Sequence, residues 1–124
     1  MGTYFSKDKV VNEKTESTMS SVTMIEDPDQ FETFIASDRL VLVDYYADWC
    51  PPCRMFAPIL DQLSVEFDGQ VAIGKVNVDD LAEVTEEQGI ACMPTFIFYK
   101  NGAQLDRVEG ASESAVRELI AKHK

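Results

Sequence analysis

Two cysteines, Cys50 and Cys53, lie where an apolar segment ends and a helical pattern begins. A thiol near a helix N-terminus faces unpaired backbone N–H groups and the positive end of the helix dipole, and both favour the thiolate. The thiolate is the reactive form of cysteine. Side chains at the N-cap and N3 positions can meet, so the two sulfur atoms can close a disulfide. The chemistry expected at this turn is therefore thiol–disulfide exchange.

The dipeptide between the cysteines affects the donors around the sulfur atoms. Pro51 and Pro52 have no backbone N–H, so the nearest donors to the Cys50 sulfur are the amides of Cys53 and Arg54. We expect Cys50 at the exposed edge of the turn and Cys53 one turn inward. This difference in access makes Cys50 the predicted attacking thiolate and Cys53 the predicted resolving thiol.

The same cysteine pair is also half of a possible zinc site. A structural zinc ion needs four ligands, and only Cys92 and the C-terminal His123 remain to complete the set. A Cys-x-x-Cys pair within a β-α-β pattern is typical of redox motifs. We therefore expect no metal and no cofactor in this chain, and we interpret His123 as a solvated residue.

Asp44 interrupts the apolar segment 40–47, shortly before Cys50. A buried carboxyl is costly to ionise, so its pKa should rise, which suits a base that accepts the proton of Cys53. Two alternatives stay open at this point. Asp44 faces solvent if its strand is at the edge of the sheet, and Lys75 is either its cationic partner or a solvent-facing lysine.

A second group of residues precedes the segment 95–99. Pro94 follows Met93, and a proline there can take the rare cis form, although the sequence by itself favours trans. Cys92 is a redox sensor, a dimer cross-link or an inert small residue, and we favour an exposed, reactive thiol.

Composition excludes several classes of protein. The chain has 124 residues, which fits one domain, and a net charge of −11, which disfavours nucleic-acid binding. It has no apolar run of the length of a membrane span and no apolar signal region. Three cysteines without a signal argue against a secreted disulfide scaffold, so we expect a cytoplasmic protein.

The first 21 residues are polar, and we interpret them as a mobile arm before a domain at 22–124. Met1 to Ser6 fits the N-myristoylation pattern, with Gly2 exposed after removal of Met1. An untargeted tail is the favoured alternative, and a single acyl chain would give only weak membrane association.

The hydrophobic periodicity of the rest predicts an α/β fold, a central mixed sheet with helices on both faces. The alternation implies parallel strands, and Asn101-Gly102 marks a hairpin that adds antiparallel ones. Tyr45 and Tyr46 are interpreted as sheet packing. The expected strands are 22–25, 40–47, 71–78, 95–99 and 104–109, and the expected helices are 27–37, 50–67, 81–88 and a last one from 112.

Five segments follow one another in a characteristic order and spacing: Val43–Cys53, Lys75–Asp80, Cys92–Phe96, Lys100–Gly102 and Val108–Ala111. In this order and spacing they resemble the thioredoxin family, over about residues 22–124. The resemblance implies the thioredoxin fold and a dithiol reductase site.

The resemblance implies a role for each matching residue. Cys50 would be the nucleophile, Cys53 the resolving cysteine, and Asp44 the buried proton acceptor with Lys75 as its partner. Pro94 would be a cis-proline facing the disulfide. The substrate groove would comprise Trp49, Pro51, Pro52, Met93, Pro94 and Gly110, and Cys92 would match the extra cysteine of animal-type members, which can link two chains.

The implied function is the reduction of protein disulfides, with peroxiredoxins among the substrates and a thioredoxin reductase that uses NADPH as the electron donor. The alternative is a binding module of the same fold in which redox state gates docking with little turnover. One departure concerns the dipeptide: the family usually has Gly-Pro where this chain has Pro51-Pro52. The sequence therefore does not predict the reduction potential.

Overall fold

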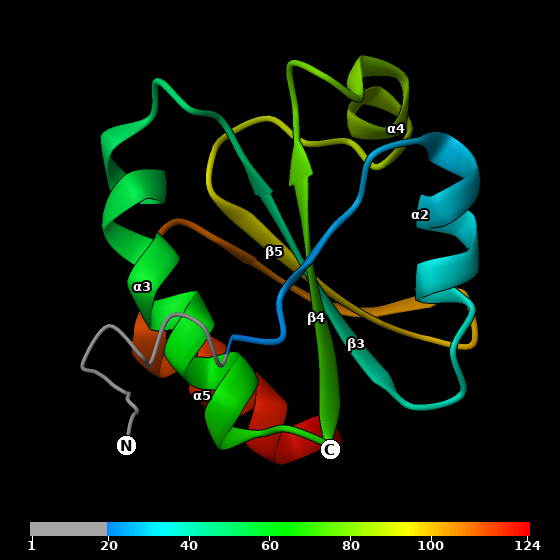
Figure 1. Cartoon of the computed structure of the whole chain (residues 1–124), viewed down its shortest axis with the longest axis vertical. Coiled ribbons are helices and arrows are strands. Elements are labelled where there is room, and N and C mark those ends of the chain that lie inside the picture. Colours follow the sequence, from blue (N-terminus) through cyan, green and yellow to red (C-terminus); the bar gives the residue numbers. More distant parts are fainter. Residues whose placement is uncertain (1–19) are drawn as a thin grey trace, which may run out of the picture.

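The computed structural model describes residues 20–124, and Gly2 lies outside them. The core of these described residues is one mixed sheet of five strands in the order β2-β4-β3-β5-β6 (Figure 1). β3 pairs in parallel with β4 and antiparallel with β5, so β3 is the central strand. The strands are β2 (Thr23–Met24), β3 (Leu40–Tyr46), β4 (Val71–Asn77), β5 (Thr95–Lys100) and β6 (Ala103–Glu109).

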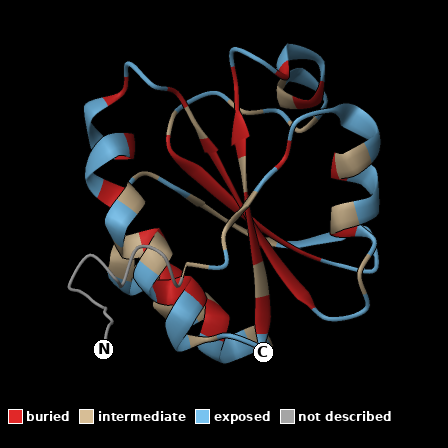
Figure 2. Ribbon diagram, in the orientation of Figure 1, coloured by how far each residue is buried: buried red, intermediate tan, exposed pale blue. Residues whose placement is uncertain are grey.

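In the described part of the chain, four helices cover the two faces of the sheet, with α3 and α5 on one side and α2 and α4 on the other (Figure 1). Each pair packs over its own cluster of buried apolar residues. The helices are buried only where they meet the sheet, whereas β3 is buried over most of its length (Figure 2). The helices are α2 (Pro28–Ile35), α3 (Pro51–Glu66), α4 (Ala82–Glu87) and α5 (Glu113–His123).

Local sequence signals explain where these elements begin and end. The Asp27 side chain accepts a hydrogen bond from the backbone N–H of Gln30 and caps α2. The Ser112 side chain accepts one from the backbone N–H of Ala115 and caps α5. Asn101 lies at the β5–β6 hairpin with a φ of 54°, a left-handed conformation that asparagine tolerates. The predicted order and the predicted fold class are confirmed.

The first described residues lie against α3. Ser20 Oγ donates a hydrogen bond of 2.7 Å to Asp61 Oδ1, and the Ser21 amide donates one of 3.0 Å to Ser64 Oγ.

Among residues 20–124, no helix combines the length and the apolar character needed to cross a membrane.

Candidate active site

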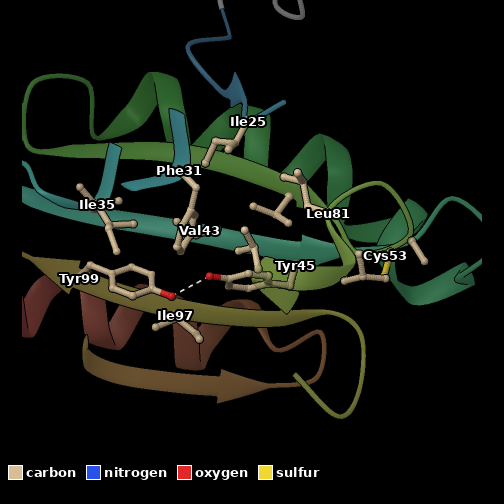
Figure 3. Close-up of a cluster of buried hydrophobic side chains, with 14 of the residues drawn as sticks. Ile25, Phe31, Ile35, Val43, Tyr45, Cys53, Leu81, Ile97 and Tyr99 are labelled. Atoms are coloured by element: carbon tan, nitrogen blue, oxygen red, sulfur yellow. Dashed lines mark hydrogen bonds between the residues drawn. The ribbon is translucent and has the colours of Figure 1, made fainter. Parts of the chain in front are cut away.

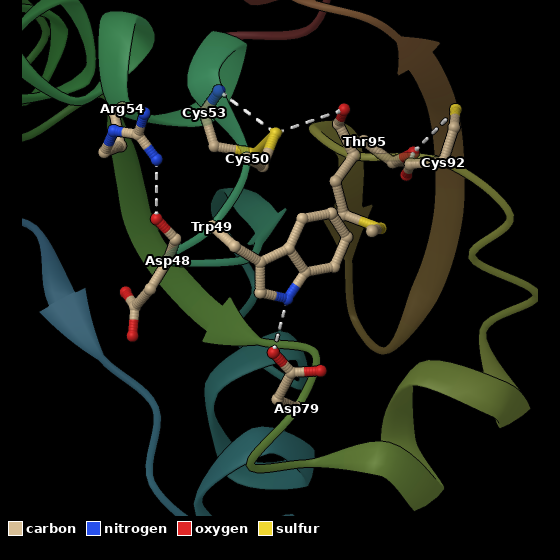
Figure 4. Close-up of a disulfide and its surroundings, with 9 residues drawn as sticks. Asp48, Trp49, Cys50, Cys53, Arg54, Asp79, Cys92 and Thr95 are labelled. Carbon is tan, nitrogen blue, oxygen red and sulfur yellow. Dashed lines mark hydrogen bonds between the residues drawn. A yellow bond between two sulfur atoms is a disulfide. The ribbon is translucent and has the colours of Figure 1, made fainter.

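The carboxyl end of β3 leads into the turn that carries both cysteines. Cys50 is the N-cap of α3, and Pro51 and Pro52 occupy the first helical positions with exposed side chains. Cys50 and Cys53 form a disulfide with their Cα atoms 5.3 Å apart. The backbone amide of Cys53 donates to Cys50 Sγ at 3.3 Å (Figure 4). The predicted disulfide is thus observed, and the two cysteines lie at the N-terminus of a helix as predicted.

The predicted difference in exposure between the two cysteines is wrong for this oxidised form. Each is only 4% exposed. The cause lies in the facing loop, because Cys50 Sγ is 3.6 Å from the carbonyl oxygen of Met93. The two sulfur atoms differ instead in their surroundings. Cys50 Sγ faces this loop and accepts a hydrogen bond from the backbone amide of Cys53, whereas Cys53 lies within the helix.

The facing loop joins α4 to β5 and contains the bond Met93–Pro94, which is cis. The trans form that the sequence by itself favours is therefore wrong, and the cis form implied by the family resemblance is the one observed. Tertiary contacts hold this loop end: Thr95 Oγ1 donates to the Cys92 carbonyl at 2.7 Å, and the Gly110 amide donates to the Pro94 carbonyl at 2.9 Å. Met93 thus lies beside the disulfide, and Gly110 is bonded to the neighbouring residue Pro94.

Cys92 is exposed and forms no disulfide within the described chain. Its sulfur lies 3.7 Å from Thr95 Oγ1, at the outer side of the same loop (Figure 4). The predicted exposure of Cys92 is confirmed. Its reactivity stays a prediction.

Trp49 is 62% exposed beside the disulfide, and a partner that the sequence reasoning missed orients its ring. Its indole Nε1 donates to Asp79 Oδ2 at 2.9 Å (Figure 4). Asp79 follows β4, the parallel neighbour of β3. Because carboxyl ends of adjacent parallel strands meet at one edge of a sheet, an aspartate two residues after the end of that strand was the available signal.

Asp44 lies in the middle of the central strand and is 1% exposed, which excludes the edge-strand alternative. Burial raises the pKa of its carboxyl to about 7, and the positive charge of Lys75 opposes part of that rise. Its Oδ1 atom has no hydrogen-bond partner among the described residues. A buried carboxyl with this pKa can gain and lose a proton near neutral pH.

Lys75 is the direct neighbour of Asp44 on β4, as the sheet register shows. Its side chain is half-buried, and Nζ lies 4.5 Å from the centre of the Tyr46 ring. The aromatic face stabilises the ammonium group. Tyr46 therefore contributes to the site in addition to the sheet packing expected from the sequence.

Two other sequence expectations concern metal ligands. Among residues 20–124, no group of three or more His, Cys, Asp or Glu side chains is arranged to hold a metal ion. His123 lies far along the chain from the cysteines and is not simply solvated: its Nε2 is 3.0 Å from Asp106 Oδ2. This contact joins α5 to β6.

Comparisons with known proteins agree with this geometry. Residues 22–122 match the family model described as Thioredoxin. The chain is 44% identical over 94 residues to "Thioredoxin 1" of Plasmodium falciparum, which covers 76% of this chain and 89% of that protein. It superimposes on the crystal structure of Malassezia sympodialis thioredoxin with a TM-score of 0.80 and 38% identity, over 84% of this chain and 91% of that chain.

A further similar structure comes from work on the thiol resolving mechanism in yeast mitochondrial 1-Cys peroxiredoxin via glutathione/thioredoxin systems. It is 28% identical with a TM-score of 0.77, over 82% of this chain and 95% of that chain. The matches and the Cys50–Cys53 pair make this chain a thiol-disulfide oxidoreductase, a protein-disulfide reductase. The chain belongs to the thioredoxin family.

Proposed function

We propose that the two cysteines have different roles in one catalytic cycle. The Cys50 thiolate attacks a disulfide of a protein substrate, forms a mixed disulfide and releases one substrate thiolate. Cys53 then attacks Cys50 Sγ, which releases the second substrate thiolate and oxidises the pair. Two electrons pass to the substrate, and one disulfide is exchanged for another. The observation that carries this proposal is the Cys50–Cys53 disulfide at the N-terminus of α3.

In this cycle Asp44 accepts the proton of Cys53 during resolution, and Lys75 modulates the basicity of Asp44. The burial of Asp44 and a pKa of about 7 support the role, because a base with a pKa near the working pH transfers protons efficiently. The strand register that places Lys75 beside Asp44 supports the second assignment.

We assign substrate docking to the residues around the disulfide. The exposed indole of Trp49 and the half-buried side chain of Met93 offer contact area, whereas Pro94 is buried next to Met93 in the same loop. The carbonyl of Met93 lies 3.6 Å from Cys50 Sγ. Pro51, Pro52 and Gly110 complete the proposed surface, since the two prolines are exposed and Gly110 bonds to Pro94.

The electron donor in this proposal is a thioredoxin reductase that uses NADPH, and peroxiredoxins are one class of substrate. The similarity to the structure from the yeast peroxiredoxin study supports the choice. We place the reaction in the cytoplasm, on the basis of the low cysteine count. Three further assignments stay proposals: the domain at 22–124 behind an arm at 1–21, weak membrane association through an acylated Gly2, and a dimer linked through Cys92.

A redox-gated binding module with little turnover is not favoured, because the chain keeps both cysteines and its relatives are thioredoxins. Reduction of insulin by the wild type, Cys50→Ser and Cys53→Ser proteins tests the cycle. We expect no turnover for either variant and a trapped mixed disulfide for Cys53→Ser only. Wild-type turnover by Cys50→Ser would overturn the proposed roles.

A further inference from the structure

Two tyrosine hydroxyls meet inside the core, on the sheet face covered by α2 and α4. Tyr45 on β3 and Tyr99 on β5 are 0% and 1% exposed, and their hydroxyl oxygens are 2.6 Å apart (Figure 3). The Tyr99 hydroxyl donates a second bond of 2.7 Å to Gln88 Oε1. Tyr45 is therefore the donor to Tyr99, since Tyr99 has a single proton.

The hydrogen-bonded chain continues from Gln88 to the surface through an arginine. Arg107 on β6 donates to the carbonyl of Gln88 at 2.6 Å and to the carbonyl of Gly89 at 3.1 Å. Gln88 directly follows α4, so both its side chain and its backbone are held by residues of the sheet. A cation at a helix C-terminus is also electrostatically favourable.

These contacts fix the beginning of the loop whose end faces the disulfide. The loop leaves α4 at Gln88 and reaches Met93, and its far end is held by Thr95 and Gly110 as described above. Within residues 20–124, Arg107 is the residue whose side chain donates hydrogen bonds to the first two carbonyl groups of the loop, those of Gln88 and Gly89. Burial raises the pKa of Tyr99 to about 12, so its hydroxyl stays protonated and can donate at neutral pH.

We infer that Tyr99, Gln88 and Arg107 are positioning residues that hold the 88–94 loop in the place where protein substrates dock. None of them is hydrogen-bonded to Cys50 or Cys53, and they act through the backbone of the loop. The inference rests on the proposed docking beside Met93. It implies that loosening the loop weakens substrate binding without changing the chemistry of the cysteines.

Tyr45 and Tyr99 provide a matched pair of variants. Tyr99→Phe removes the link to Gln88, whereas Tyr45→Phe removes an equally buried hydroxyl and leaves Tyr99 donating to Gln88. Reduced protein is mixed with increasing concentrations of insulin, and oxidation is followed by the fluorescence of Trp49, the single tryptophan. Dithionitrobenzoate, a small disulfide with little surface for the loop, serves as the second substrate.

We expect Tyr99→Phe to raise the half-saturating insulin concentration about fivefold, the effect of one hydrogen bond, with the limiting rate unchanged. The rate with dithionitrobenzoate should stay at the wild-type value, and Tyr45→Phe should match the wild type with both substrates. Gln88→Leu, which changes no buried tyrosine, should reproduce the result of Tyr99→Phe. Hydrogen exchange at the amides of Cys92 and Met93 should be faster in both affected variants.

Tyr99→Phe has two consequences: it removes the link to Gln88, and it leaves the Tyr45 hydroxyl unpaired. The double variant Tyr45→Phe/Tyr99→Phe also lacks the link but has no unpaired tyrosine hydroxyl, so it shows which of the two consequences weakens substrate binding. If its half-saturating concentration returns to the wild-type value, the unpaired hydroxyl was the cause and the inference is wrong. Equal effects of Tyr45→Phe and Tyr99→Phe, or unchanged half-saturation in Tyr99→Phe, would also overturn it. A wild type that fails to reduce insulin would instead overturn the proposed function, and the inference with it.

Discussion

Asp44 and Tyr45 are consecutive residues of the central strand, and each buries a polar group on an opposite face of the sheet. On the face covered by α3 and α5, Asp44 Oδ1 has no hydrogen-bond partner among the described residues. On the other face, the Tyr45 hydroxyl is bonded to Tyr99, which is bonded to Gln88. The same strand therefore carries one polar group that burial disfavours and one that the surrounding structure satisfies.

This difference separates two uses of buried polar groups. An unpaired carboxyl destabilises the fold when it ionises, and such a group persists where its proton is useful. A fully bonded hydroxyl chain adds directional contacts that an apolar core lacks, and so it can fix the position of a loop. Removing the polar group should accordingly have opposite effects on stability on the two faces.

The largest effect is expected for Asp44→Asn. The pKa of Asp44 is 3.8 in its ordinary state and about 7 in the fold, so between these pH values only the unfolded chain releases the proton. The free energy of unfolding of the wild type should therefore fall as the pH rises through this window. Asp44→Asn should be more stable than the wild type above pH 7, by about 4 kcal/mol.

Urea unfolding of the oxidised proteins at pH 4 and pH 8 measures this difference. The two proteins should differ little at the lower pH, where Asp44 is neutral. A constant difference at both pH values would show that Asp44 is not the titrating group and would remove the contrast between the two faces.

The tyrosine face should respond in the opposite direction. Tyr99→Phe leaves the buried Tyr45 hydroxyl unpaired, so we expect a loss of about 2 kcal/mol, and Tyr45→Phe should lose about 1 kcal/mol. The double variant should lose less than the sum, because no hydroxyl is then left unpaired. Denaturant unfolding of the four proteins forms a double-mutant cycle, and strict additivity would contradict the hydroxyl pair.

The smallest effect is expected for Lys75→Met. The charge of Lys75 lowers the pKa of Asp44, so its removal should raise that pKa further. The range of pH over which the free energy of unfolding falls should then extend to a higher pH than in the wild type. At pH 4 the variant should lose less than about 1 kcal/mol, the worth of its contact with Tyr46. Lys75→Arg keeps the charge and is the control; if Lys75→Met and Lys75→Arg give the same profile, Lys75 does not act on Asp44 through its charge.

The reactive turn was predictable because its signals are local. The Cys-x-x-Cys spacing, the apolar strand before it and the helical pattern after it all lie within a short segment around Cys50. The exposure of Cys50 was not predictable, because the residue that covers its sulfur, Met93, lies in a loop distant along the chain. The same holds for the bond between Trp49 and Asp79, which joins the ends of two neighbouring strands.

Buried polar residues show where prediction from the sequence ends and where the tertiary structure is needed. Periodicity placed Asp44 within an apolar strand and Tyr45 in sheet packing, but it could not choose between an edge and a central strand. Only the pairing of β3 with both β4 and β5 decided that Asp44 is excluded from water.

By itself, the sequence determined the order of helices and strands, the cysteine turn and the family, because propensity, periodicity and motif spacing act over a few residues. The tertiary structure decided which polar atoms are paired. Asp44 has an oxygen without a hydrogen-bond partner among residues 20–124, and a pKa of about 7, because the sheet surrounds it. Tyr45 instead meets Tyr99 because antiparallel pairing brings β5 beside β3. Burial and partnership depend on contacts between distant segments, and these exist only once the chain has folded.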